Sequence, residues 1–173
     1  MYDKPFIPVI QKTSILLIMA FVSIVAFTLA FFSREVIIST TYDMKVNSAG
    51  QMEKAMAVLK NIRMQKGVFV DIENDPNETG LIGTQFSLIT TDEGDLDAKL
   101  TTLDPNFSAA MVELLTRAGL TSGDTIAVML TGSMPGANIA VLIACDALGI
   151  HPIVVTSIGA SQWGANDPDM TWL

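Results

Sequence analysis

The feature that most constrains this chain is an uncharged apolar run near its start, from Ser14 to Phe32. At about 1.5 Å of rise per residue, a helix of this length spans about 28 Å, close to the thickness of a bilayer's hydrocarbon core. A core helix of a soluble protein would carry a polar stripe, and this run has only scattered Ser and Thr. We therefore predict a transmembrane helix over residues 14–32.

Flanking charges set the expected orientation of this helix. Lys4, Lys12 and the terminal amine precede it, whereas Arg34 and Lys45 follow it, and this balance favours a cytoplasmic N-terminus. The lead-in over residues 1–13 also has the character of a signal-sequence n-region.

Cleavage after Ala30 is an alternative, but the apolar run continues beyond that residue. We expect an uncleaved signal-anchor in the inner membrane, with a cytoplasmic lead-in and the bulk of the chain extracytoplasmic.

The rest of the chain is strongly acidic. From Asp71 onward there are fourteen acidic residues and two basic ones, Lys99 and Arg117, a balance that makes a nucleic-acid partner improbable. Cys145 is the single cysteine, which excludes an internal disulfide framework and a multi-cysteine metal site. Its apolar surroundings indicate a small core residue.

Residues 33–67 are expected to form a stalk with an amphipathic helix from Ser48 to Lys66, which serves as a stalk or packing helix; a partner-binding helix is the alternative. Short strands are predicted over residues 68–72 and 85–91. Between them, residues 71–80 form an acidic loop. Calcium is less favoured there than simple solvation, because proline stands where an EF-hand loop needs glycine.

The second half predicts α/β packing. Asp104 and Pro105 open a helix that ends at Gly119. A strand over residues 125–130, a loop over 131–138, a helix over 139–148 and a strand over 153–156 then follow. This order is typical of parallel α/β structure, so we predict a Rossmann-like parallel α/β domain over residues 68–173.

Ligands of open α/β sheets bind beyond the carboxyl ends of the strands. Two polar loops lie at such ends, one over residues 131–138 and one that starts at Thr156 and Ser157. The first leads into a helix N-terminus, where free N–H groups favour an anion. We expect the loops to lie side by side and predict a ligand or anion site from Thr131, Gly132, Ser133, Asn138, Ser157, Ser161, Gln162, Trp163, Asn166 and Asp167. The alternative is that Ser133 and Asn138 cap a helix and that Trp163 fills a hydrophobic corner.

Named catalytic motifs do not match. There is no GxGxxG, the TGSMPGAN loop lacks the Gly-Lys-Ser/Thr ending of a P-loop, and neither Ser133 nor Ser161 fits GxSxG. His151, the single histidine, lies at the entry end of its strand, away from the two loops. The pair Asp167 and Asp169 is more typical of a solvated loop than of a metal site. Catalytic residues and cofactors therefore stay unassigned, and no metal is predicted.

The segments TGSMPGANIAVLIACDALGI and VVTSIGASQWGANDPDMTW resemble the family of poly-gamma-glutamate system proteins, and SQWGANDPDMTW is the most specific part. The likeness extends to GLIGTQFSLITTDEGDLDAKLTTLDPNFSAAMVELL and to the N-terminal anchor. It implies a bacterial, membrane-anchored accessory component of poly-γ-glutamate (capsule) biosynthesis or export, whose partners are the bilayer and other synthase or export subunits. Members of the family are longer, so we expect the α/β domain to be incomplete at its C-terminus.

Two other functions stay open. One is a hydrolase or transferase acting on γ-glutamyl amides at the two loops. The other is a phosphosugar-binding domain, because the TGS loop is similar to the strand–loop–helix that holds a phosphosugar in sugar isomerase domains.

Overall fold

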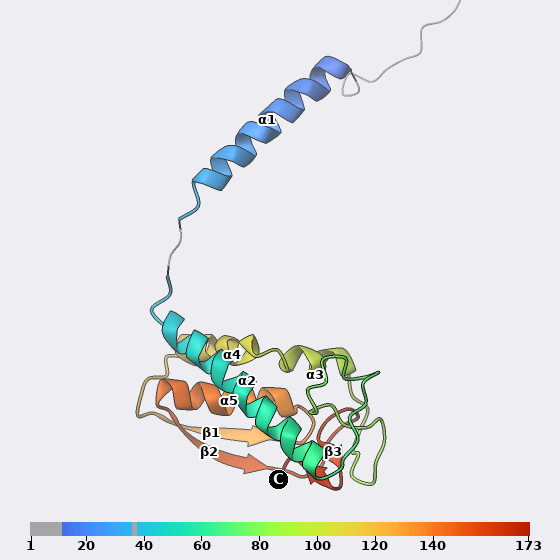
Figure 1. Cartoon of the computed structure of the whole chain (residues 1–173). Coiled ribbons are helices and arrows are strands. Elements are labelled where there is room, and N and C mark those ends of the chain that lie inside the picture. The colour runs from blue at the N-terminus through green and yellow to red at the C-terminus, as the bar shows by residue number, and fades with distance from the viewer. Residues whose placement is uncertain (1–11, 36–37) are drawn as a thin grey trace, which may run out of the picture. The chain divides into compact units, whose positions relative to one another are not determined.

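The computed structural model describes residues 12–35 and 38–173, in two separate units, one up to Ile38 and one from Ser39 onward. The first unit contains one helix, α1 (Thr13–Phe32), shown in Figure 1. None of its side chains is buried, and it is long and apolar enough to cross a membrane, a test that a signal sequence also passes. Most of the predicted cytoplasmic lead-in lies outside the described residues.

The second unit is a mixed α/β domain. Its helices are α2 (Tyr42–Gln65), α3 (Leu96–Thr102), α4 (Asn106–Arg117) and α5 (Pro135–Leu148). Its strands are β1 (Thr125–Leu130), β2 (His151–Thr156), β3 (Asn166–Asp167) and β4 (Met170–Thr171). A small parallel sheet is therefore present, as predicted, within a mostly helical domain.

The domain is arranged in layers (Figure 1). β1 and β2 pair in parallel, from Thr125 opposite His151 to Leu130 opposite Thr156. α5 lies between this sheet and the layer formed by α2 and α4. The main core forms where α2, α3 and α5 meet, around Met52, Leu103 and Ile139.

α2 belongs to this domain and is not a stalk outside it. It begins before the predicted start at Ser48, and its Met52 side chain is fully buried against the other helices. α2 is therefore a packing helix, and the compact unit begins at Ser39.

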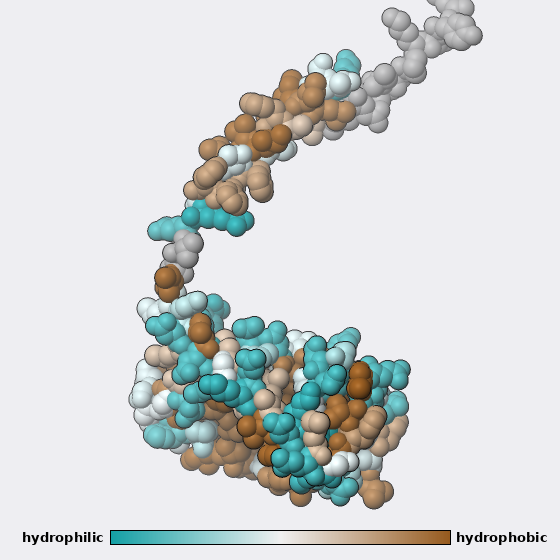
Figure 2. All heavy atoms as spheres, in the orientation of Figure 1, coloured by the Kyte–Doolittle hydropathy of each residue, from teal (hydrophilic) through white to brown (hydrophobic). Residues whose placement is uncertain are grey.

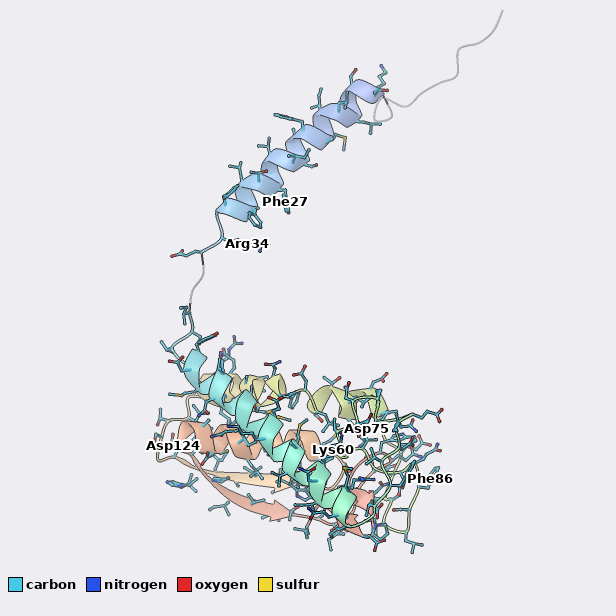
Figure 3. All side chains as sticks on the ribbon, in the orientation of Figure 1. Phe27, Arg34, Lys60, Asp75, Phe86 and Asp124 are labelled. Carbon is cyan, nitrogen blue, oxygen red and sulfur yellow. The ribbon has the colours of Figure 1, made fainter. Side chains whose placement is uncertain are left out.

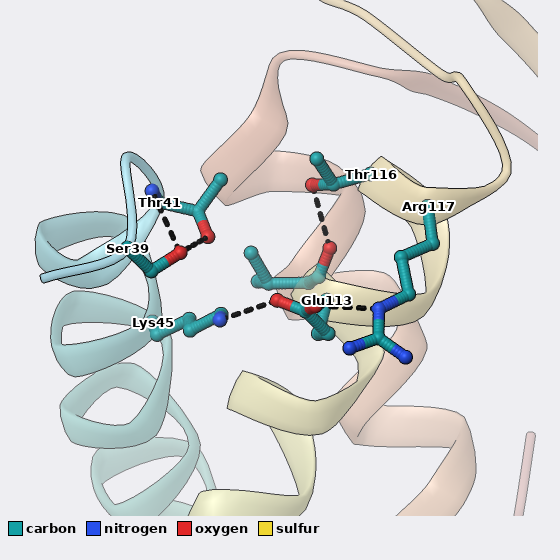
Figure 4. A network of polar contacts seen from close by, with 7 residues as sticks. Ser39, Thr41, Lys45, Glu113, Thr116 and Arg117 are labelled. Carbon is teal, nitrogen blue, oxygen red and sulfur yellow. Dashed lines mark hydrogen bonds and ion pairs between the residues drawn. The ribbon is translucent and has the colours of Figure 1, made fainter. Parts of the chain in front are cut away.

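A charged network ties α2 to α4 (Figure 4). The Lys45 ammonium and the Arg117 Nε, at 2.6 Å, both donate to the carboxylate of Glu113. These hydrogen bonds hold the pKa of Glu113 below its usual range. Because the contacts lie at the surface, they set the register of the two helices more than they stabilise the fold.

The prediction of strands at 68–72 and 85–91 is wrong. Residues 68–95 form an irregular segment whose only strand-like contact is a single bridge between Thr90 and Ala160. Scattered backbone bonds and side chains share the backbone groups: the Thr91 N–H donates to the Ala160 carbonyl, Arg63 donates to the Phe69 carbonyl, and the Asn166 amide bonds both backbone groups of Thr84. Local β propensity yields to these bonds.

The predicted helix and strand boundaries shift mainly at their starts. α5 begins at Pro135, four residues before the prediction, because proline at the first helical position needs no hydrogen-bond partner. α4 begins at Asn106 with Pro105 as its N-cap, one position later than predicted; the Asp104 carboxylate accepts the Asn106 N–H at 2.8 Å, and Gly119 follows the helix end with a positive φ. β1 has the predicted bounds.

Candidate functional site

The two polar loops lie side by side at the carboxyl ends of β1 and β2, which confirms their predicted juxtaposition. The Gly132 N–H donates to the Gly159 carbonyl at 3.1 Å, and the Ala165 N–H donates to the Gly132 carbonyl at 2.7 Å. Backbone-to-backbone bonds of this kind hold the loops in a fixed relation, so their side chains form one cluster.

A lysine that the sequence analysis did not select stands at the centre of this cluster. Lys99 of α3 is only 2% exposed. Its ammonium donates to the backbone carbonyl of Ser133 and, at 2.9 Å, to the hydroxyl of Ser161. The Ser161 N–H in turn donates to the Ser133 hydroxyl at 3.0 Å. We call Lys99, Ser133 and Ser161 the lysine–serine cluster.

Local structure explains how Lys99 reaches this position. The Asp95 carboxylate caps α3 by accepting the Ala98 N–H at 3.1 Å. Just before it, the Gly94 N–H donates to the side-chain oxygen of Gln162 at 3.3 Å, which fastens the start of α3 to the second loop. The helix thus directs Lys99 between the two loops.

The sequence contained a signal for Lys99. The residue lies three positions after Leu96 and four before Leu103, on the apolar face of a short helix, where a lysine is rarely placed without a specific partner. Because no helix was predicted there, this position was missed.

The cluster is electrostatically unusual. None of the ion pairs among the described residues includes Lys99, and the nearby Asp95 opposes the loss of its charge only in part. Burial lowers the pKa of Lys99. A buried amine between neutral oxygen atoms is thereby shifted toward its uncharged form, the form that accepts a proton.

Two predicted ligand residues use their polar groups inside the protein. The Asn138 amide donates to the Thr131 carbonyl at 2.7 Å, in the first turn of α5. The fully buried Asn166 amide bonds the backbone of Thr84 and donates to the Thr90 hydroxyl at 2.9 Å. These two asparagines hold loops in place, and the predicted alternative of a helix cap is wrong, because no side chain caps α5.

Trp163 packs against the hydrophobic core, as the same alternative predicts. Its φ of +61° is uncommon for a residue with a side chain. Its backbone explains the conformation: the Trp163 N–H donates to Thr84 and its carbonyl accepts from Gly83. The strained residue joins the second loop to the irregular segment.

The remaining predicted residues divide between two places. Thr131 and Gln162 flank the cluster: the Thr131 hydroxyl accepts the Ser133 N–H at 3.2 Å, and Gln162 bonds Gly94. Ser157 is exposed, and Asp167 accepts the Asp169 N–H at 2.9 Å and acts electrostatically on Arg63. The structure therefore brings together part of the predicted set, around two serines and the unpredicted lysine.

The glycines of the loops approach the protein's own chain and not an open ligand space. A Cβ on Gly132 would lie 2.9 Å from the Ala160 side chain, and one on Gly136 would lie 2.5 Å from the Thr102 carbonyl. Gly164 is equally close to Gly132. Small residues are needed here for packing, and the result is a rigid frame around Lys99.

A cavity of about 80 Å³ lies at a separate place, beside a second buried cation. Its walls come from α2, the start of α5 and the C-terminal segment: Leu59, Arg63, Gly80, Leu81, Pro135, Ala165, Met170, Thr171 and Trp172. Arg63 is only 4% exposed and donates to the carbonyls of Phe69 and Gly80. Its guanidinium mainly holds the irregular segment.

The acidic loop is also organised from within. Asp75, labelled in Figure 3, is fully buried and accepts the Gly80 N–H at 2.7 Å and the Thr79 N–H at 3.0 Å. Asp71 binds the side chain of Asn74. Over residues 12–35 and 38–173 no group of three or more His, Cys, Asp or Glu side chains is placed to hold a metal ion.

No family model matches this chain, and no curated protein or solved structure is significantly similar to it. The resemblance to the poly-gamma-glutamate system proteins therefore stays a prediction.

Proposed function

We propose that this protein is a membrane-anchored accessory component of a poly-γ-glutamate biosynthesis or export system. The observation that carries the proposal is the place of the segment SQWGANDPDMTW, residues 161–172, on which the resemblance rests. It supplies Ser161 to the lysine–serine cluster and four residues to the wall of the cavity beside Arg63. The distinctive part of the sequence thus coincides with the most unusual chemistry of the domain.

The location follows from α1. We propose that α1 is an uncleaved signal-anchor in the inner membrane, and that the α/β domain is extracytoplasmic, beside the other synthase or export subunits. Supporting this, α1 is apolar along its whole length, and basic residues precede it. The β1–α5–β2 unit is proposed to be part of a Rossmann-like sheet.

The charge of the domain limits how it would meet an anionic polymer. The whole chain has a formal net charge of −8, and most of its acidic residues lie in the domain, so the domain's surface repels polyglutamate. Recognition would depend on local positive groups, of which Lys99 and Arg63 are the buried ones, or on bridging cations. We therefore expect contact with a chain end or a single residue of the polymer and not with a long stretch.

Deletion of the gene tests the proposal. We expect a change in the yield, length or surface attachment of poly-γ-glutamate, restored by the full-length gene supplied in trans. A matched gene that lacks residues 13–32 should not restore it, because the domain would no longer be held at the membrane. Polymer that is unchanged in all three properties after deletion would refute the role.

A second candidate is a hydrolase or transferase that acts on γ-glutamyl amides. The contact between the Lys99 amine and the Ser161 hydroxyl favours it, because a buried amine can serve as the base for a serine nucleophile. Release of shortened polymer or free glutamate by the purified protein would support this function over a purely structural one.

A further inference from the structure

The lysine–serine cluster has the composition and contacts of a nucleophile with its base. We propose that Ser161 is a catalytic nucleophile that Lys99 activates, and that together they open an amide or ester through an acyl-enzyme. The inference rests on the second candidate function only for the identity of a natural substrate. The chemistry itself follows from the described side chains.

The hydrogen bonds fit a neutral amine. Uncharged Nζ has two N–H groups and one lone pair, so it can donate to the Ser133 carbonyl and accept the hydroxyl proton of Ser161 across the observed 2.9 Å. This separation lies within the reach that a general base needs. The Ser133 carbonyl fixes the amine, and the bond from the Ser161 N–H to the Ser133 hydroxyl fixes the backbone of the nucleophile.

The surroundings favour the amine as a base. Asp95, at the start of α3, is the titratable group that acts on Lys99 and preserves part of its charge. Residues 131–134 of the first loop and 159–164 of the second contain no titratable side chain, and neither does the first turn of α5. Burial without a paired carboxylate is the arrangement that lowers the pKa of lysine to where it can work as a base.

Other residues do not fill this role. His151 lies at the opposite end of β2 from the loops. The hydroxyl of Ser133 is occupied with the Ser161 N–H, and Lys99 contacts Ser133 through the carbonyl alone. Ser133 is therefore a positioning residue. Ser161 is partly exposed, whereas Lys99 beneath it is buried.

The reaction balances without a further cofactor. The Ser161 hydroxyl gives its proton to Lys99 as its oxygen bonds to the acyl carbon. The C–N or C–O bond of the substrate then breaks, and Lys99 returns the proton to the leaving amine or alcohol. Water, activated in turn by the neutral amine, adds to the ester and releases the acid and free Ser161. A second amine in place of water would give transfer.

The test uses the full-length protein in detergent micelles and a fluorescent fluorophosphonate, which reacts covalently with activated serines. We expect labelling at Ser161, located by peptide mass spectrometry, at a rate that rises with pH as Lys99 loses its proton. Ser161→Ala should abolish labelling. Lys99→Met should slow it about 100-fold or more, the usual contribution of a general base. Ser122→Ala, an exposed serine at the other end of the sheet, is the control and should label normally.

Trp163 and Trp172, the two tryptophans, both belong to the α/β domain, so their fluorescence shows whether each variant is folded. A folded wild-type protein that does not label at any pH up to about 9.5 would overturn the proposal, as would unchanged labelling of Ser161→Ala or of folded Lys99→Met. If Lys99→Met does not fold, the pH profile of the wild type decides, because a rate independent of pH excludes a titrating base. None of these outcomes alters polymer yield in the deletion strain, so the two proposals fail separately.

Discussion

At the scale of single residues, the domain depends on buried polar side chains that bond backbone groups of irregular segments. Arg63, Asp75, Lys99 and Asn166 are all nearly or fully buried, and each satisfies groups on loops that have no strand partner. Because an unpaired buried backbone group is costly, these side chains replace the sheet hydrogen bonds that the segment lacks. Arg63, Asp75 and Asn166 in this way hold parts of residues 68–95, and Lys99 holds the loop at Ser133.

Lys99 should make the stability of the domain depend on pH in a specific direction. Its pKa is lowered in the folded state, whereas the unfolded chain has the ordinary value of about 10.4. Between these two values the unfolded state binds more protons, so the free energy of unfolding rises with pH across that window and is constant below it. Urea titrations at a series of pH values, followed by tryptophan fluorescence, measure this rise.

The Lys99→Met protein should lack the rise, whereas Lys54→Met, at an exposed position on α2, should keep it. An identical pH profile for the wild type and Lys99→Met would mean that Lys99 keeps its proton in the folded protein.

At the scale of elements, two helical glycines differ in the space around them: one lies in a close helix contact and the other does not. Gly136 lies in the first turn of α5, where a Cβ would meet the Thr102 carbonyl at 2.5 Å, whereas Gly50 in α2 has open space around it. We expect Gly136→Ala to lower the free energy of unfolding by about 1–3 kcal/mol, because α5 must move away from α3.

Gly50→Ala is the matched control and should raise the free energy of unfolding by up to about 1 kcal/mol through helix propensity alone. Equal effects of the two substitutions in urea denaturation would contradict the close contact between α5 and α3.

The parallel sheet is covered on one face only. Figure 2 shows apolar surface where β1 and β2 lie, and Met129 is 85% exposed while its neighbour Leu130 is 7% exposed. Parallel strands normally have both faces covered, so this sheet departs from the common pattern. Successive side chains of β1 point alternately to the covered face and to the exposed face of the sheet.

Substitutions on the two faces of β1 should change the free energy of unfolding by different amounts. Leu130→Ala should cost about 2–5 kcal/mol, because the side chain leaves a gap in packed core. Met129→Ala should change the free energy of unfolding by less than about 0.5 kcal/mol, as at other exposed positions. A large loss of stability from Met129→Ala would show that another surface covers this face of the sheet in the protein under study.

At the scale of the whole molecule, α1 is the candidate membrane anchor, since it is long and apolar enough to cross a bilayer. We expect the full-length protein in the membrane pellet after an alkaline carbonate wash, with an intact mass that includes residues 1–30. Removal of residues 13–32 should release it to the supernatant, because α1 is the one helix among the described residues that is long and apolar enough to cross a membrane. A soluble protein whose mass begins after Ala30 would identify α1 as a cleaved signal sequence.

The sequence by itself determined the elements whose signals are local. The apolar run predicts α1, the continuous hydrophobic residues predict β1, and Asp104, Pro105 and Gly119 mark the ends of α4. Each depends on neighbours within a few positions, through helix length, capping or glycine conformation. The meeting of the two loops also followed from sequence, since adjacent parallel strands end at one edge.

Only the tertiary structure decided what fills that edge. Lys99 reaches Ser161 across sixty-two positions of the sequence, and Asn166 reaches Thr84 across eighty-two. Contacts at such separations leave no periodic pattern, because they depend on how α3 and the irregular segment pack onto the loops. The strands expected at 68–72 and 85–91 do not form, because bonds set by the tertiary structure, from Arg63 to Phe69 and between Ala160 and residues 89 and 91, hold these segments without a regular ladder.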